Sequence, residues 1–159
     1  KTNEAAAFKI LKAKLESGEP YQVFKDMVKM QGGSTKSVDR PETVPLSRYH
    51  FNLTSPKSGT VQRISAREIG FISLLTGAGR KKKEDRVDYS AGVTLNKKIG
   101  DTIEKDELLA TLYTNKKGAI ESVKSRLLQA FTITDKPVSP PVMIEQYIGE
   151  DGKAAPLPE

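Results

Sequence analysis

"LNKKIGDTIEKDELLATLYTN", residues 95–115, is the stretch that decides the fold. It holds two polar turn signals, one at Gly100-Asp101 and one at Lys105-Asp106, with the short apolar segment "TI" between them. The run "LLATLYT" (108–114) that follows is rich in strand-forming residues. The stretch therefore predicts a β-rich module of short strands joined by tight turns.

The residues upstream extend this β pattern. Tyr49, Phe51 and Leu53 alternate with polar residues, "SPKSG" (55–59) predicts a turn, and "TVQRI" (60–64) alternates again. "GVTL" (92–95) predicts a further short strand, and "VMIEQYI" (142–148) predicts a C-terminal edge strand. Most of residues 48–148 is therefore expected to be strands and turns.

Two helices are expected within this module. Ile69, Ile72 and Leu75 fall at helical spacing in "AREIGFISLLTGAG" (66–79). A last helix is expected from Gly118, with these residues on one face: Ile120, Val123, Leu127, Leu128 and Phe131.

The N-terminal residues predict a helical hairpin. Glu4–Glu16 carries one apolar face and should end at Gly18, because glycine accommodates a left-handed helix cap. Pro20 opens a second helix that runs to Met30, before the Gln31–Gly33 stop. Such a hairpin needs a partner to cover its apolar residues.

The predicted fold class is thus α+β, with a β-rich module of barrel-sandwich or hammerhead-like type. We expect a helical hairpin at 1–33 that belongs to a larger α/β domain, and a linker at 34–47. The C-terminal β-rich module then spans 48–148, and residues 149–159 form a disordered tail.

Composition limits the functional classes. The chain carries a net charge of +6, is 36% apolar and has no cysteine, which excludes disulfides and thiolate chemistry and fits a cytoplasmic protein. No run approaches the 18 apolar residues of a membrane span. The chain begins with Lys1 rather than Met, so we interpret it as a fragment or a processed product.

"LLTGAGRKKKED" (74–85) places glycines beside cations, which raises the question of a phosphate site. The dinucleotide fingerprint fails because Lys82 occupies its third glycine position, and a P-loop is absent. Gly77 and Gly79 also follow a helix, so they meet its C-terminal end, which repels anions. We interpret the stretch as a helix stop with a left-handed glycine cap and a solvated basic loop.

The sequence gives little support for metal binding, for catalysis or for specific nucleic-acid recognition. His50 is the sole histidine, and one histidine cannot build a metal cluster or activate a nucleophile without partners. Glu84, Asp85 and the acids of 101–106 lie in turns without acid–base spacing. The basic run Arg80–Lys83 lacks interleaved aromatic residues, so nonspecific RNA binding stays open while specific nucleic-acid recognition is not favoured. We expect no catalytic, cofactor-binding or metal-binding residue in the chain.

The 95–115 stretch resembles the half-repeat of biotinyl and lipoyl carrier domains, and "SPKSGTVQRI" (55–64) resembles the start of such a half. The resemblance places Lys116 or Lys117 near the position of the modified lysine. A predicted helix follows from Gly118, whereas a carrier needs a second strand that completes a hairpin. A stand-alone binding or carrier-like module therefore remains an alternative.

A second resemblance covers about residues 4–131. Four segments are similar, in order and spacing, to the C-terminal part of the pyrimidine-nucleoside phosphorylases, a family that includes thymidine phosphorylase. They are "FKDMVKMQGG" (24–33), "SGTVQRISAREIG" (58–70), "LLTGAGRKKKEDRVDYSAGVTLNKKIGD" (74–101) and "ELLATLYTN" (107–115). Asp106 stands where the family has glycine, and Asp tolerates the left-handed backbone of that turn. The AMP phosphorylases share this architecture and remain an alternative.

The resemblance implies a parent enzyme that cleaves a pyrimidine nucleoside with phosphate to give a free base and a pentose 1-phosphate. It implies that the groups binding phosphate and base, and those that distinguish thymidine from uridine, lie upstream. The homodimer contacts would lie mainly upstream as well. The fragment would then be inactive alone and need no cofactor. It further implies that the loop after the glycines borders a closing cleft, which makes Gly79, Arg80, Lys81, Lys82 and Lys83 a candidate domain-closure loop.

Overall fold

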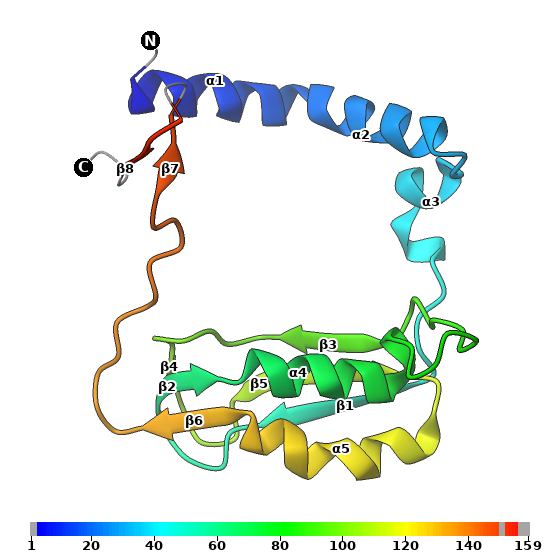
Figure 1. The fold of residues 1–159 in the computed structure, drawn as a ribbon, viewed down its shortest axis with the longest axis vertical. Helices are drawn as coiled ribbons and strands as arrows, with labels where there is room; N and C mark the ends of the chain where they lie inside the picture. Colours follow the sequence, from blue (N-terminus) through cyan, green and yellow to red (C-terminus); the bar gives the residue numbers. More distant parts are fainter. Residues whose placement is uncertain (1–2, 150–151, 156–159) are drawn as a thin grey trace. The chain divides into compact units, whose positions relative to one another are not determined.

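The computed structural model describes residues 3–149 and 152–155. The chain divides into two compact units, Lys1–Pro45 and Leu46–Glu159. Helices and strands both occur, as the predicted α+β class requires (Figure 1). No helix among the described residues is long and apolar enough to cross a membrane.

The first unit is a pair of helices followed by two short helical turns. Helix α1 (Glu4–Ser17) ends at Gly18, which adopts the left-handed conformation with φ of 76°. Helix α2 (Glu19–Met30) follows at once with a proline in its first turn. This confirms the two predicted helices and the cap between them. The predicted hairpin is wrong, because the chain does not fold back at Gly18: α2 continues from the end of α1 (Figure 1).

The segment assigned to a linker contains helical turns. Helix α3 (Lys36–Asp39) and the 3-10 helix η1 (Pro41–Thr43) both lie within residues 34–47. The Tyr21 hydroxyl on α2 donates to the Val38 carbonyl oxygen over 2.9 Å, which connects α3 to α2. The division between units falls after Pro45.

The second unit holds two three-stranded antiparallel sheets. One has the order β1-β5-β3, formed by Tyr49–Thr54, Leu108–Thr114 and Gly92–Leu95. The other has the order β4-β2-β6, formed by Thr102–Ile103, Gly59–Ile64 and Phe131–Thr134. The 95–115 stretch thus supplies strands to both sheets, as its alternation of turns and apolar runs predicts.

The turn at Asp106 has the backbone that the sequence predicts. Asp106 is the one non-glycine residue with positive φ, at 66°, among the described residues. Its amide donates to the Ser55 carbonyl oxygen over 2.8 Å, so the turn is held against the β1–β2 connection.

Two helices cover this β structure. Helix α4 (Ala66–Ser73) starts at Ser65, whose side chain accepts from the Glu68 amide, and continues into the π-type turn η2 (Leu74–Ala78). Helix α5 (Lys117–Gln129) follows β5 and contacts both α4 and β1 (Figure 1). A single core cluster joins the helices and both sheets, and its fully buried members include Val61, Ile72, Ile103, Leu109, Leu112, Val123 and Leu127.

Two expectations need correction. The last helix was expected to include Phe131, but it ends at Gln129, and Phe131 begins β6 opposite Ile64 of β2. Phe131 is 8% exposed, so it joins the core from a strand and not from the helix. The predicted edge strand 142–148 shrinks to β7 (Tyr147–Ile148), which pairs with β8 (Ala154–Ala155) and with neither three-stranded sheet.

The predicted disordered tail, 149–159, lies mostly outside the described residues. Within its described part, Ala154–Ala155 forms the β8 strand just mentioned. The remaining positions 150–151 and 156–159 are not described.

Candidate functional site

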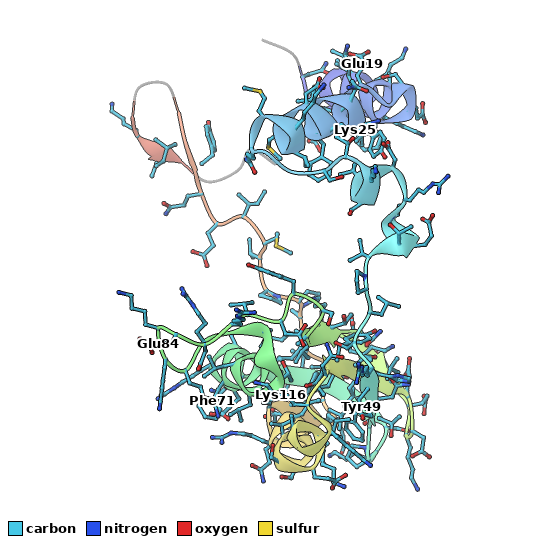
Figure 2. All side chains as sticks on the ribbon, turned by 90° about the vertical axis from the view of Figure 1, so that its right-hand side faces the viewer. Glu19, Lys25, Tyr49, Phe71, Glu84 and Lys116 are labelled. Atoms are coloured by element: carbon cyan, nitrogen blue, oxygen red, sulfur yellow. The ribbon has the colours of Figure 1, made fainter. Side chains whose placement is uncertain are left out.

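The loop of residues 79–91 connects the end of η2 to β3 and contains the candidate residues Gly79–Lys83. Gly77, just before it, adopts φ of 111°, whereas Gly79 is extended at φ of −136°. The left-handed cap that the sequence predicts therefore falls on Gly77. Figure 2 shows Glu84 on this loop, away from the labelled Lys116 at the start of α5.

The end of the α4–η2 segment offers carbonyl oxygens that are already bonded. The Thr76 carbonyl oxygen accepts the Thr114 hydroxyl over 2.7 Å, and the Gly77 carbonyl oxygen accepts the Asp88 amide over 2.9 Å. A Cβ at Gly77 would lie 3.5 Å from Lys116 Nζ, so a cation stands beside this helix end. Carbonyl oxygens that already accept hydrogen bonds are typical of a helix stop, and the partial negative charge of a helix C-terminal end disfavours phosphate.

The tip of the loop is held by one carboxylate. Asp85 Oδ2 accepts the backbone amides of Lys81 and Lys82 over 2.9 and 3.0 Å. The side chains of Arg80–Lys83 are exposed, and none forms an ion pair with another described residue. The structure thus fixes the backbone at the tip while it leaves four cationic side chains free to meet a partner.

The base of the loop is held by a network around Asp88. Its Oδ1 accepts the Ser90 amide over 3.1 Å and the Ser90 hydroxyl over 2.7 Å. Its Oδ2 accepts Asn115 Nδ2 over 2.9 Å, from the residue that follows β5. The Asn115 Oδ1 in turn accepts the Arg48 amide over 2.9 Å, and the Ser90 carbonyl accepts the Ser47 hydroxyl over 2.7 Å.

The network stabilises the charged form of Asp88. The Ser90 hydrogen bond, followed by that from Asn115, holds the pKa of this carboxyl below its ordinary value of 3.8. Partial desolvation opposes the shift, and the positive charge of Lys116 adds to it. Asp88 is therefore an ionised acceptor at neutral pH, occupied by structural donors.

Sequence reasoning missed Asp88, Ser90 and Asn115. An Asp followed two residues later by Ser is a local signal for a side-chain turn, and "DYS" (88–90) carries it. No local pattern pairs Asn115 with a residue 27 positions earlier, since that contact exists only once β5 lies beside the loop.

The remaining sequence candidates lie apart from this network. His50 is exposed on β1, opposite Tyr113 of β5. Asp101 lies in a turn and accepts the Lys98 amide over 2.7 Å, and Asp106 occupies the left-handed turn before β5. The described residues contain no group of three or more His, Cys, Asp or Glu placed to hold a metal ion.

The two carrier-like lysines occupy a helix start. Lys116 is the N-cap of α5 and Lys117 its first residue, so β5 leads into a helix. A carrier lysine needs a second strand to complete its hairpin, and here that strand is replaced by α5. The geometry therefore disfavours the carrier alternative.

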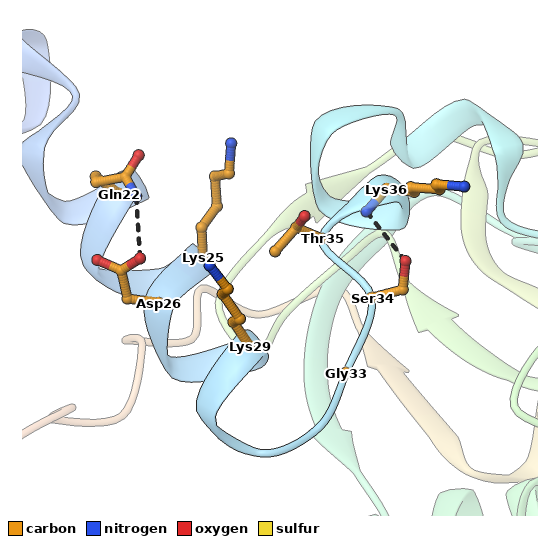
Figure 3. Close-up of a pocket in the computed structure, with 8 residues that line it drawn as sticks. All are labelled: Gln22, Lys25, Asp26, Lys29, Gly33, Ser34, Thr35 and Lys36. Atoms are coloured by element: carbon orange, nitrogen blue, oxygen red, sulfur yellow. Dashed lines mark hydrogen bonds between the residues drawn. The ribbon is translucent and has the colours of Figure 1, made fainter.

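The first unit contains a hollow of about 520 Å³ beside α2 (Figure 3). Its lining residues are Gln22, Lys25, Asp26, Lys29, Gly33, Ser34, Thr35 and Lys36. Lys25 is paired with Asp39 over 2.7 Å, a hydrogen bond that raises the pKa of Lys25 above its ordinary 10.5. Figure 3 shows Lys36 directed away from Lys25, so these cations do not converge on one ligand.

Known proteins match this chain over most of its length. The family model "Pyrimidine nucleoside phosphorylase C-terminal domain" matches residues 60–134. The pyrimidine-nucleoside phosphorylase of Staphylococcus aureus strain bovine RF122 / ET3-1 is 38% identical over 136 residues, which is 86% of this chain. That of strain MSSA476 is 39% identical over 126 residues, or 79% of this chain.

The residues that the family model matches include the loop of residues 79–91 and the strands β3 and β5 beside it. The chain is therefore a member of the pyrimidine-nucleoside phosphorylase family. It corresponds to the C-terminal domain of that family, preceded by helices α1 and α2. The chain spans about a third of the length of these relatives, 31% of the first and 29% of the second.

Proposed function

We propose that the chain is the C-terminal portion of a cytoplasmic pyrimidine-nucleoside phosphorylase. The parent protein would cleave a pyrimidine nucleoside with phosphate and release the free base and a pentose 1-phosphate. Support comes from the names of the relatives and from the third of their length that the chain covers. Phosphate is the co-substrate in this proposal, and the parent acts as a homodimer without a further cofactor.

The reacting groups belong to the upstream portion in this proposal. Among the described residues, His50 is exposed without a catalytic partner, and Asp88 is engaged by Ser90 and Asn115. General acid–base work needs a group within hydrogen-bond reach of the substrate and free to exchange a proton. We therefore expect the purified chain to be inactive alone and to act as scaffold for the parent.

Helices α1 and α2 support the existence of a covering partner. All residues of α1 and α2 are described, and none is buried. Their exposed apolar side chains are Phe8, Ile10, Leu11, Leu15, Tyr21, Val23, Phe24, Met27 and Met30. An apolar surface of this kind marks an interaction site. We assign it to the upstream portion of the same protein.

The observation that carries a functional role for this domain is the basic loop. Its backbone is fixed at the tip by Asp85 and at the base by Asp88, while Arg80–Lys83 stay exposed. We propose that Gly79–Lys83 close over the reaction site, with Arg80 meeting an acceptor on the facing domain. A planar guanidinium suits such a contact because it can bind a carboxylate through two hydrogen bonds. Closure excludes water and fixes the reacting groups.

Substitution in the full-length protein tests this role. Arg80→Ala should lower kcat/KM about tenfold, which corresponds to about 1.4 kcal/mol of lost transition-state stabilisation. Lys105→Ala, which removes an exposed cation from the β4–β5 turn, is the matched control and should leave kinetics unchanged. Wild-type kinetics in Arg80→Ala would reject the closure role.

A further inference from the structure

The loop is closed on a single residue, Asp88. The Asp88 amide donates to the Gly77 carbonyl oxygen over 2.9 Å. This hydrogen bond brings the two ends of residues 78–87 together. The carboxylate of the same residue then binds Asn115 at the end of β5 over 2.9 Å. Backbone and side chain of Asp88 together connect both ends of the loop to the central strand of the β1-β5-β3 sheet.

The side-chain amide of Asn115 both donates and accepts hydrogen bonds. Its Nδ2 donates to Asp88 Oδ2 and to Ser90 Oγ, the latter over 3.1 Å. Its Oδ1 accepts the Arg48 amide, at the start of β1. The orientation of the side chain is therefore determined by its neighbours. A displaced Asp88 would leave donors on Asn115 and Ser90 without their acceptor.

Both side-chain oxygens of Asp88 act as hydrogen-bond acceptors. Asp88 Oδ1 receives two donors from Ser90, and Oδ2 receives one from Asn115. An asparagine at position 88 offers one oxygen and one NH₂ group, so its NH₂ would face a donor at one of these contacts. Charge also matters, since hydrogen bonds to an ionised carboxylate are about twice as strong as neutral ones.

We infer that Asp88 is a positioning residue of the phosphorylase, whose carboxylate, through Asn115, sets where the Arg80–Lys83 cations stand. The inference rests on the proposed closure function of this loop. Asp88 acts at a distance in this scheme: it touches the loop base and β5, and it holds the backbone from which Arg80 projects. Catalytic geometry is sensitive to such support, because small misplacements cost large factors in rate.

Two readouts on the full-length protein test the inference. Trypsin cleaves after lysine and arginine, so its rate of cleavage within residues 80–86, followed by mass spectrometry, reports whether the loop backbone is held in place. Steady-state kcat and KM report whether its position matters. Asp88→Ala should raise the cleavage rate in the loop at least tenfold and lower kcat about tenfold. Asp88→Asn should give smaller changes in both, because it retains one acceptor oxygen.

A matched control and a coupling test separate positioning from general destabilisation. Asp101 accepts the Lys98 amide over 2.7 Å in another turn of the same domain. Asp101→Ala should leave loop cleavage and kcat at wild-type levels. Asn115→Ala should reproduce the Asp88→Ala effects, and the double variant should be no slower than either single one, since the two residues act as a unit. If Asp88→Ala fails to fold, Asp88→Asn and Asn115→Ala carry the test.

The outcomes distinguish the two proposals. Unchanged loop cleavage in the Asp88 and Asn115 variants would overturn the inference, whatever the effect of Arg80→Ala. Faster cleavage with wild-type kinetics would show that Asp88 holds a loop with no part in closure, which contradicts the proposed function as well. Fully additive effects in the double variant would contradict action through Asn115.

Discussion

Asn115 Nδ2 donates to Asp88 Oδ2 over 2.9 Å, and this contact joins the end of the central strand β5 to the base of the basic loop. The two residues are 27 positions apart in the chain. The contact anchors the base of the loop at the end of β5, the most buried strand of its sheet, even though the tip of the loop is exposed. Four cations that project from a fixed backbone lose less freedom on meeting a partner than four on an unanchored loop.

The anchor should weaken only in strong acid. Because the pKa of Asp88 is lowered in the folded protein, its stabilising contribution is complete above the ordinary value of 3.8. It is lost as pH falls below 3.8 through the folded-state pKa. The backbone amide signal of Ser90, which donates to Asp88 Oδ1, should therefore shift in an NMR titration with a midpoint below 3.8. A midpoint at or above that value would contradict the described network.

Replacing Gly59 and Gly70 by alanine should change the free energy of unfolding in opposite directions. Gly59 adopts φ of 151°, and a Cβ there would lie 2.7 Å from the Thr134 carbonyl oxygen on β6. Gly59→Ala should lower the free energy of unfolding by about 1–3 kcal/mol, because a backbone clash adds to an unfavourable conformation. Gly70 lies exposed in α4 with open space at its Cβ position. Gly70→Ala should raise the free energy of unfolding by about 0.5–1 kcal/mol.

Urea denaturation of both glycine variants measures these changes. The midpoint should move down for Gly59→Ala and up for Gly70→Ala, with the slope unchanged if each acts on the folded state. Equal shifts of the same sign would mean that the β2–β6 contact at Gly59 is not as described.

Replacing Asp106 by glycine should preserve stability better than replacing it by alanine. Its φ of 66° is left-handed, a conformation that costs an ordinary L-residue about 1–2 kcal/mol. Asp106→Ala should therefore destabilise the chain by about 1 kcal/mol, while Asp106→Gly should be neutral or slightly stabilising. Thermal unfolding of the pair decides the matter, and an alanine variant as stable as the glycine variant would contradict the left-handed turn.

Much of the fold could be predicted because its signals are local. Alternation in residues 49–53 and helical spacing at Ile69, Ile72 and Leu75 predict which face is buried, and the core cluster confirms those faces. Strand β2 departs from its predicted alternation, because a register shift between Val61 and Arg63 lets both Val61 and Ile64 pack against the core. The glycine at position 18 ends a helix for a reason confined to its own backbone. Predictions of this kind need no knowledge of the tertiary partner.

The errors occur where a local pattern fits two structures. Phe131 lies four positions after Leu127, which is the spacing of a helical face, yet it is buried from β6. Only the pairing with β2 shows which element holds it. The role of Asp88 was missed for a different reason, because its partner Asn115 is 27 positions away and is brought near only by the sheet.

The most direct test of the account is whether residues 1–159 can catalyse the reaction alone. Purified chain, free of host phosphorylase by mass spectrometry, is incubated with thymidine or uridine in phosphate buffer, and free base is followed by chromatography. The full-length protein serves as the positive control. We predict no base above the enzyme-free background, because our proposal assigns the reacting groups to the upstream portion. Phosphate-dependent release of thymine or uracil by the chain itself would contradict the account.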